Sequence, residues 1–195
     1  MQNAGSKQPM AGQGDERLEM RPLGAREYPA VVEIYRQTPR FIVELNGRPA
    51  ESIGLEIVEE DAARAAHHGA VFAGLFLRES STMIGVADWV PAGYKGRPSQ
   101  AWIALLMIAE PYQRRGYGSE ADRLIEETIW ADPAVQTIGL GVPTNNGPAL
   151  GFWQTMGYHR VGSTVLDQDG REVLILQKHR PRQGSRDGHA TETAG

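Results

Sequence analysis

The chain has 195 residues, the length of one ordinary domain, and its hydrophobic content of 41% is enough to build a complete core. Since it contains no cysteine, disulfide bonds, thiolate metal sites and a cysteine nucleophile are excluded, and a cytoplasmic location fits a chain that needs no oxidising compartment. A formal net charge of -4 disfavours nucleic acid as a partner, because broad binding to it requires a basic face.

Both ends of the chain are rich in Gly, Ser, Gln, Pro and charged residues, with little apolar surface to bury. We expect residues 1–16 and 181–195 to be disordered tails, and residues 17–180 to form the folded domain. The N-terminus lacks a signal-peptide pattern, and the longest apolar run, Ala101–Ala109, is far shorter than the ~20 residues that cross a bilayer. The sequence therefore predicts no membrane partner.

The domain is predicted to begin with a strand at Leu18–Pro22 and a helix near Ala25–Gln37. The stretch 38–68 is predicted to be partly helical. It is interrupted at Pro39, Gly47, Pro49 and Gly54. Such an irregular helical region suits either a variable element that recognises the substrate or a simple connection. Its acidic residues could attract a cationic amine or form an exposed helix face; they are Glu56, Glu59, Glu60 and Asp61.

Three strands are predicted next. Val71–Arg78 and Met83–Val90 are rich in β-branched and aromatic residues, and the turn 79–82 between them favours a hairpin. After a stretch rich in Pro and Gly, the apolar run Ala101–Ile108 predicts a third, buried strand.

The segment after this strand, Gln113–Ser119, combines glycines with positive charge at the start of a predicted helix. Gly116 and Gly118 would let the backbone approach a ligand closely, while Arg114 and Arg115 supply positive charge beside it. A glycine-rich turn between a strand and a helix directs free backbone N–H groups and the helix dipole at one point, which suits a pyrophosphate. The alternative is that the two glycines only make a tight turn. We call this segment the binding loop.

The helix that begins at the binding loop is predicted to reach Trp130. Its apolar stripe is Ala121, Leu124, Ile125, Thr128 and Ile129. A strand at Thr137–Val142 and a helix at Pro148–Met156 follow, and a last hairpin turns near Asp167–Gly170. Antiparallel strands followed by a strand-helix-strand crossover predict a mixed α/β sheet with helices on both faces.

Two motifs in this order resemble the GNAT superfamily of N-acetyltransferases. The first is Gln113-Arg-Arg-Gly-Tyr-Gly118, and the second is Asn146-Gly-Pro-Ala-Leu-Gly-Phe-Trp-Gln-Thr-Met-Gly-Tyr158. The resemblance implies an α/β (α+β) fold with a mostly antiparallel sheet of six to seven strands, in which the strands before and after the binding-loop helix splay apart to admit coenzyme A. It also implies acetyl-CoA as cosubstrate and transfer of the acetyl group to a primary amine of an unidentified small molecule or peptide.

The same resemblance assigns roles to individual residues. The binding loop would hold the pyrophosphate of the coenzyme through Gln113, Arg114, Arg115, Gly116, Tyr117, Gly118 and Ser119. The backbone of Leu106, Met107 and Ile108 would pair with the pantetheine amides. Asn146 would contact the coenzyme or the splayed strand end, although capping of the following helix explains it equally well.

The sequence departs from the superfamily at the catalytic positions. The predicted strand Ala101–Ile108 lacks the glutamate that serves many members as general base. Trp153 occupies the position where many members have a tyrosine that acts as general acid. The nearest carboxylates are Asp88 and Glu110, which we take as catalytic candidates. Tyr112, Tyr117 and Tyr158 are possible proton donors, of which Tyr158 is more typical of a packing position. Orientation of the amine beside the thioester could also supply much of the acceleration by itself.

Two other functions fit parts of the sequence. Trp102 and Trp153 at the usual base and acid positions would suit a coenzyme A-binding sensor or regulatory module that has lost catalysis. A dinucleotide-binding enzyme is less favoured, because the segment 139–143 ends without the carboxylate that would hold a ribose. No histidine spacing indicates a metal site, and a homodimer is possible.

Overall fold

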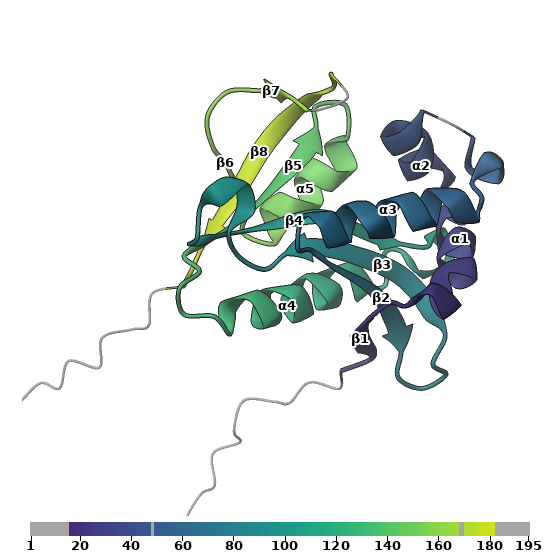
Figure 1. The fold of residues 1–195 in the computed structure, drawn as a ribbon. Helices are drawn as coiled ribbons and strands as arrows, with labels where there is room; N and C mark the ends of the chain where they lie inside the picture. Colours follow the sequence, from purple (N-terminus) through teal and green to yellow (C-terminus); the bar gives the residue numbers. More distant parts are fainter. Residues whose placement is uncertain (1–15, 48, 168–169, 182–195) are drawn as a thin grey trace, which may run out of the picture.

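The computed structural model describes residues 16–47, 49–167 and 170–181 (Figure 1). Its centre is an eight-stranded sheet with the order β1-β2-β3-β4-β5-β8-β6, and β7 also pairs with β8. The strands are β1 (Leu18–Pro22), β2 (Val71–Leu77), β3 (Met83–Val90), β4 (Gln100–Ile108), β5 (Thr137–Pro143), β6 (His159–Arg160), β7 (Val165–Leu166) and β8 (Glu172–His179). Every pairing is antiparallel except that of β4 with β5. The predicted mixed, mostly antiparallel sheet is confirmed, and the two-residue strands β6 and β7 bring its strand number to eight.

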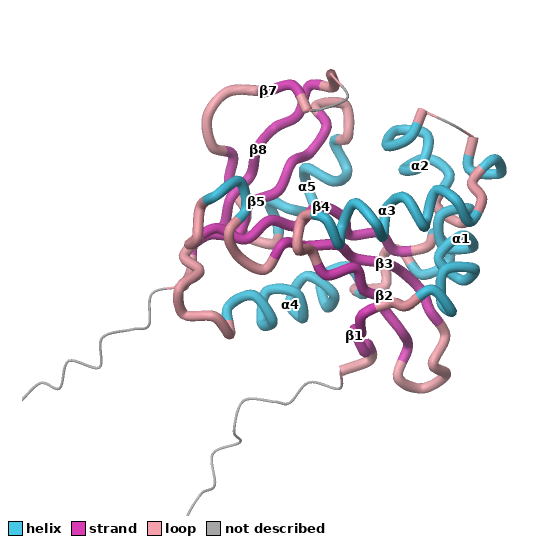
Figure 2. Tube along the Cα trace, in the orientation of Figure 1, coloured by secondary structure: helices cyan, strands magenta, loops and turns pink. Residues whose placement is uncertain are grey.

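Helices cover both faces of the sheet, as predicted (Figure 2). The main helices are α1 (Tyr28–Arg36), α2 (Pro39–Asn46), α3 (Leu55–His67), α4 (Tyr117–Trp130) and α5 (Gly147–Thr155). Short 3-10 turns lie at η1 (Ala25–Glu27), η2 (Ala50–Ser52), η3 (Tyr94–Gly96) and η4 (Glu110–Tyr112). The first three helices share a buried cluster with Val86, whereas α4 and α5 share another with the next residue, Ala87. Because neighbouring strand residues point to opposite faces, α1–α3 lie on one face of the sheet and α4 and α5 on the other.

The region that was least regular in sequence, 38–68, folds as α2, η2 and α3. Pro39 occupies the first turn of α2, and Gly47 ends that helix with a φ of 65°, a left-handed conformation that glycine adopts without strain. The helix predicted near 25–37 is divided into η1 and α1. The predicted tails lie outside the described residues apart from Glu16 and Pro181, as do Gln168 and Asp169 of the last turn, so these predictions remain untested.

A buried carboxyl lies inside the α4–α5 layer. Asp122 of α4 is only 2% exposed, and its Oδ1 accepts a hydrogen bond of 3.3 Å from the hydroxyl of Tyr158. Burial, and to a lesser extent the nearby Glu126, raise the pKa of Asp122 to about 7, although Lys178 and the hydrogen bond from Tyr158 oppose the shift. Lys178 is itself held by Glu126 at 2.6 Å. The ionised form of Asp122 is therefore disfavoured in the folded protein.

Substitution of Asp122 with asparagine should stabilise the protein at alkaline pH. The pKa of this carboxyl is about 7 when folded and about 4 when unfolded, so the folded protein binds the proton more tightly. The protonated carboxyl therefore contributes fully to the free energy of unfolding below pH 4, and this contribution is lost as pH rises from 4 through 7. The asparagine side chain cannot ionise, but it keeps an acceptor for Tyr158. Urea unfolding at pH 5, 6.5 and 8 should show an advantage of the variant that grows with pH to about 1–2 kcal/mol.

The matched control is Glu19→Gln, which changes an exposed carboxyl on β1. It should not reproduce the pH-dependent difference. An Asp122→Asn curve that runs parallel to that of the natural protein from pH 5 to pH 8 would contradict the argument from burial.

Candidate functional site

The binding loop runs from the end of η4 into the first turn of α4 and has the geometry of an anion site. Arg114 and Gly116 adopt left-handed conformations, with φ of 58° and 84°. This alternation, followed directly by the start of α4, leaves the backbone N–H groups of residues 114–119 without an acceptor anywhere in the described parts of the chain. Such a concave row of N–H groups at a helix N-terminus attracts phosphate. The predicted residues of the binding loop are therefore brought together as one continuous site.

Two contacts fix the loop relative to its neighbours. The side-chain amide of Gln113 donates a hydrogen bond of 2.8 Å to the carbonyl of Ile108, so it ties the loop to the end of β4. Gly118 lies against α5, because a Cβ at this position would be 3.3 Å from Cε2 of Phe152. A side chain at Gly118 would thus require the ring of Phe152 to move by a few tenths of an ångström.

The sheet opens beside the binding loop. Residues Gln100–Ile103 of β4 pair with Thr137–Leu140 of β5, and the pairing ends there although both strands continue. At the same level the register between β3 and β4 shifts, and Ala104 is the extra residue of this bulge. Ala104 is exposed and Leu105 and Leu106 are half-buried, in the middle of a central strand. The expected splay is confirmed, and bulges at such places commonly border active sites.

The residues expected to bind pantetheine lie on this open part of β4. Leu106 is half-buried, while the side chains of Met107 and Ile108 are buried, so the latter two can offer only their backbone to a ligand. The carbonyl of Ile108 is already used by Gln113. Asn146 follows the other strand of the opening and accepts a bond of 3.1 Å from the N–H of Ala149, which confirms its capping role. Its contact with a coenzyme stays a prediction.

Asp88 lies on β3 opposite Leu105, next to the bulge. It is half-buried, and its Oδ1 is buried without a hydrogen-bond partner among the described residues. Burial raises the pKa of Asp88 to about 6, although the positive charge of Arg64 opposes the shift. A carboxyl with a pKa near the working pH is suited to accept a proton.

A polar network from the helical layer lies near Asp88. The hydroxyl of Tyr35 on α1 donates a hydrogen bond of 2.8 Å to Oδ2 of Asp61 on α3, and Arg64 forms an ion pair with the other oxygen of Asp61. Burial raises the pKa of Tyr35 well above its usual range. This arrangement was not predicted from the sequence, because Tyr35 and Arg64 belong to segments far from any motif.

Glu110 occupies a different environment. It is exposed in η4, and in the described residues its side chain makes no hydrogen bond or ion pair. Its backbone N–H donates to the carbonyl of Gln37. Glu110 therefore lies in solvent, outside the polar and partly buried surroundings that Asp88 occupies, and the structure favours Asp88 over Glu110 as a proton acceptor.

The tryptophans at the usual base and acid positions are packing residues. Trp102 covers β5, because a Cβ at Gly139 would be 2.8 Å from its ring, and it stacks on Tyr94 with centroids 4.4 Å apart. Trp153 is buried and packs edge-on against Tyr158 at 5.1 Å. Tyr158 is fully buried, which confirms that it is a packing residue.

Residues 16–158 match the sequence model of the acetyltransferase (GNAT) family. The chain belongs to this family. No curated protein matches this GNAT chain. In the described parts of the chain there is no group of three or more His, Asp or Glu residues that could hold a metal ion, and no helix is long and apolar enough to cross a membrane.

Solved structures share the fold of the GNAT chain. An acetyltransferase from Thermus thermophilus is 22% identical, with a TM-score of 0.67, and the match covers 84% of this chain and 97% of that one. The aminoglycoside acetyltransferase AAC(6')-Ib in complex with coenzyme A and kanamycin is 22% identical, with a TM-score of 0.67 and coverage of 84% and 95%. Spermidine N-acetyltransferase from Vibrio cholerae in complex with coenzyme A and spermine is 14% identical, with a TM-score of 0.65 and coverage of 85% and 96%. At these identities the likeness establishes the fold alone.

The topology also decides against the dinucleotide-binding alternative. That fold requires a parallel sheet, whereas β4 and β5 form the one parallel pair among the described strands. Gly139, in the segment that lacks a ribose-binding carboxylate, is explained by the ring of Trp102, which would lie 2.8 Å from a Cβ there.

Proposed function

We propose that this GNAT chain transfers the acetyl group of acetyl-CoA to a primary amine. The observation that carries the proposal is the row of unpaired N–H groups at residues 114–119, beside a central strand that is open from Ala104 onward. Anion-binding N–H groups suit the pyrophosphate, and an exposed strand edge suits the pantetheine amides. The presence of coenzyme A in the related structures of AAC(6')-Ib and spermidine N-acetyltransferase supports the proposal.

Asp88 would act as the base in this reaction. An amine in water is protonated and cannot attack a carbonyl, so the carboxylate of Asp88 accepts a proton from it, directly or through a water molecule. The amine nitrogen then forms a bond to the carbonyl carbon of the thioester and releases its second proton to water. The carbon–sulfur bond breaks, and the thiolate takes up a proton. Tyr112 is the candidate donor of that proton: its ring lies 6.4 Å from that of Tyr117 in the binding loop, whereas the ring of Tyr117 is covered by the guanidinium of Arg17.

The acceptor is proposed to be a small cationic amine or the amino group of a peptide. The related structures contain kanamycin and spermine, and each of these molecules carries several amino groups. On this chain the acidic residues of α3 favour a cation, although Asp61 is already engaged by Tyr35 and Arg64. A homodimer is possible, and it stays a prediction.

The first experiment is a calorimetric titration of the protein with acetyl-CoA and, separately, with NADH. A thiol-release assay over aminoglycosides, polyamines and peptides then tests transfer. Binding of acetyl-CoA with thiol release would support the proposed enzyme. Binding without thiol release for every acceptor would instead support the sensor module, which the packing of Trp102 and Trp153 favours. Absence of acetyl-CoA binding would overturn both.

The pH dependence of the reaction should show the ionisation of Asp88. Since the base works only when deprotonated and its pKa is about 6, kcat/KM should fall tenfold per pH unit below pH 6 and level off above it. An acceptor whose amine has a low pKa should be used, so that the ionisation of the substrate does not mask this limb. A pH profile that is flat between pH 5 and pH 7 would exclude Asp88 as the base.

A further inference from the structure

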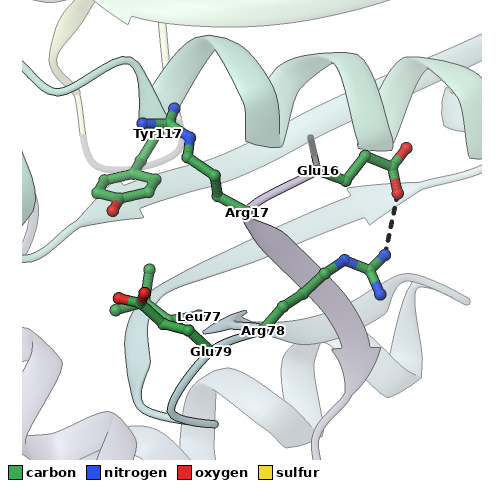
Figure 3. A pocket seen from close by; sticks show the side chains of 6 residues that line it. All are labelled: Glu16, Arg17, Leu77, Arg78, Glu79 and Tyr117. Atoms are coloured by element: carbon green, nitrogen blue, oxygen red, sulfur yellow. Dashed lines mark hydrogen bonds and ion pairs between the residues drawn. The ribbon is translucent and has the colours of Figure 1, made fainter. Parts of the chain in front are cut away.

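Arg17, which directly precedes β1, reaches the binding loop from behind. Its Nη1 donates a hydrogen bond of 3.0 Å to the carbonyl of Arg115, and its guanidinium lies over the ring of Tyr117, 4.4 Å from the centroid. Figure 3 shows Arg17 directed at Tyr117, whereas the neighbouring Arg78 turns away to Glu16. In the sequence Arg17 lies at the edge of the predicted domain, outside every motif.

Glu120, in the first turn of α4, holds Arg17 in this position. Its carboxylate is 10% exposed and accepts bonds from the backbone N–H groups of Arg17 and Leu18, at 2.7 and 2.8 Å. It also accepts from Nε of Arg17 at 3.0 Å, although the two residues are 103 positions apart. A carboxylate that is this shielded and receives several donors fixes both the side chain and the start of β1.

The bond to Arg115 has a consequence for the neighbouring amide. The carbonyl of Arg115 and the N–H of Gly116 belong to one peptide group, and the described residues contain no cis peptide. In a trans peptide these two groups point in opposite directions. When Arg17 holds the carbonyl on the rear side of the loop, the N–H of Gly116 must therefore point to the front, toward the anion site. Gly116 has a φ of 84°, a conformation that favours glycine, and a Cβ there would lie 3.3 Å from Nη2 of Arg17.

We propose that Arg17 is a positioning residue for the coenzyme. It does not touch the coenzyme but, together with Glu120, keeps the binding loop in the conformation that receives the pyrophosphate. The inference rests on the proposed function, since it concerns the affinity of the same site. Without Arg17, the binding loop would have to become ordered when the coenzyme binds. The entropy cost of this ordering weakens binding but does not change the reacting groups.

The test compares Arg17→Gln with Arg78→Gln, which removes the same charge from a side chain close by that makes no contact with the loop. Calorimetry with coenzyme A should show a Kd about tenfold higher for Arg17→Gln and unchanged for the control. The same factor is expected with 3′-dephospho-coenzyme A, because the pyrophosphate is the group affected. With an acceptor in hand, KM for acetyl-CoA should rise while kcat at saturation stays unchanged.

Three results would overturn the inference. They are an unchanged Kd in Arg17→Gln, an equal loss in Arg78→Gln, which would indicate a general effect of charge, and a fall of kcat at saturation. If Arg17→Gln fails to fold in a thermal melt, Arg17→Lys replaces it, because lysine keeps the ion pair with Glu120 but cannot also reach Arg115; wild-type affinity in that variant would equally overturn the inference. If the natural protein itself does not bind coenzyme A, the proposed function fails instead.

Discussion

Substitution of Gly118 with tryptophan is expected to abolish the binding of acetyl-CoA. A Cβ at this position would already lie 3.3 Å from the ring of Phe152, so the much larger indole would force apart α5 and the binding loop beside the N–H groups at the start of α4. Those groups would then be covered and the binding loop displaced. The Kd should rise by on the order of 100-fold or more. At ordinary concentrations calorimetry should then detect no heat of binding.

Glu127→Trp is the matched control for this variant. It introduces the same side chain on the same helix, at an exposed position near the opposite end of α4. Its affinity for acetyl-CoA should equal that of the natural protein, and thermal melts of both variants should show that the fold is kept. Undiminished binding by a folded Gly118→Trp protein would place the coenzyme elsewhere and remove the central argument for the proposed function.

Substitution of Asp88 with asparagine is expected to lower kcat by roughly 100-fold or more, the usual contribution of a general base. Asparagine has the same shape but cannot accept the proton of the amine. The limb of the pH profile near pH 6 should disappear with it, because the raised pKa of about 6 belongs to this carboxyl. The Kd for acetyl-CoA should stay unchanged, since Asp88 lies on β3 and not on the binding loop.

Glu110→Gln separates the two carboxylates that the sequence offered. Because Glu110 is exposed and its side chain makes no hydrogen bond or ion pair within the described residues, its loss should change kcat less than about threefold. A large loss of kcat in Glu110→Gln together with normal turnover in Asp88→Asn would reverse the assignment. Normal turnover in both variants would favour catalysis by orientation of the reactants alone.

The order of the elements was predictable from local patterns. Strand alternation and turn residues placed β2 and β3, helical periodicity placed α4, and Pro148 and Gly157 marked the limits of α5, where Gly157 has a φ of 88°. The binding loop could be predicted for the same reason. Its function depends on glycines, on charge and on a helix start that are contiguous in the chain, so a short stretch of sequence contains the whole signal.

The sequence named Asp88 and Glu110 as candidate catalytic residues, but it could not distinguish between them. Asp88 is an ordinary strand residue in the sequence, and only the packing of α1 and α3 over it gives it a raised pKa and an unpaired oxygen. The same holds for Trp102, whose fit over Gly139 depends on the pairing of β4 with β5. Burial and register arise from contacts between distant segments, which local patterns do not record.

The sequence by itself determined the family, the order of strands and helices, and the loop that we propose to bind a pyrophosphate, because each of these depends on residues that are neighbours in the chain. Only the tertiary structure decided which carboxyl is shielded from water, where the sheet opens, and that Arg17 supports the loop through Glu120. These features depend on distance in space. Arg17 and Glu120 lie 103 positions apart in the sequence, and the fold brings Nε of Arg17 to 3.0 Å from Oε2 of Glu120.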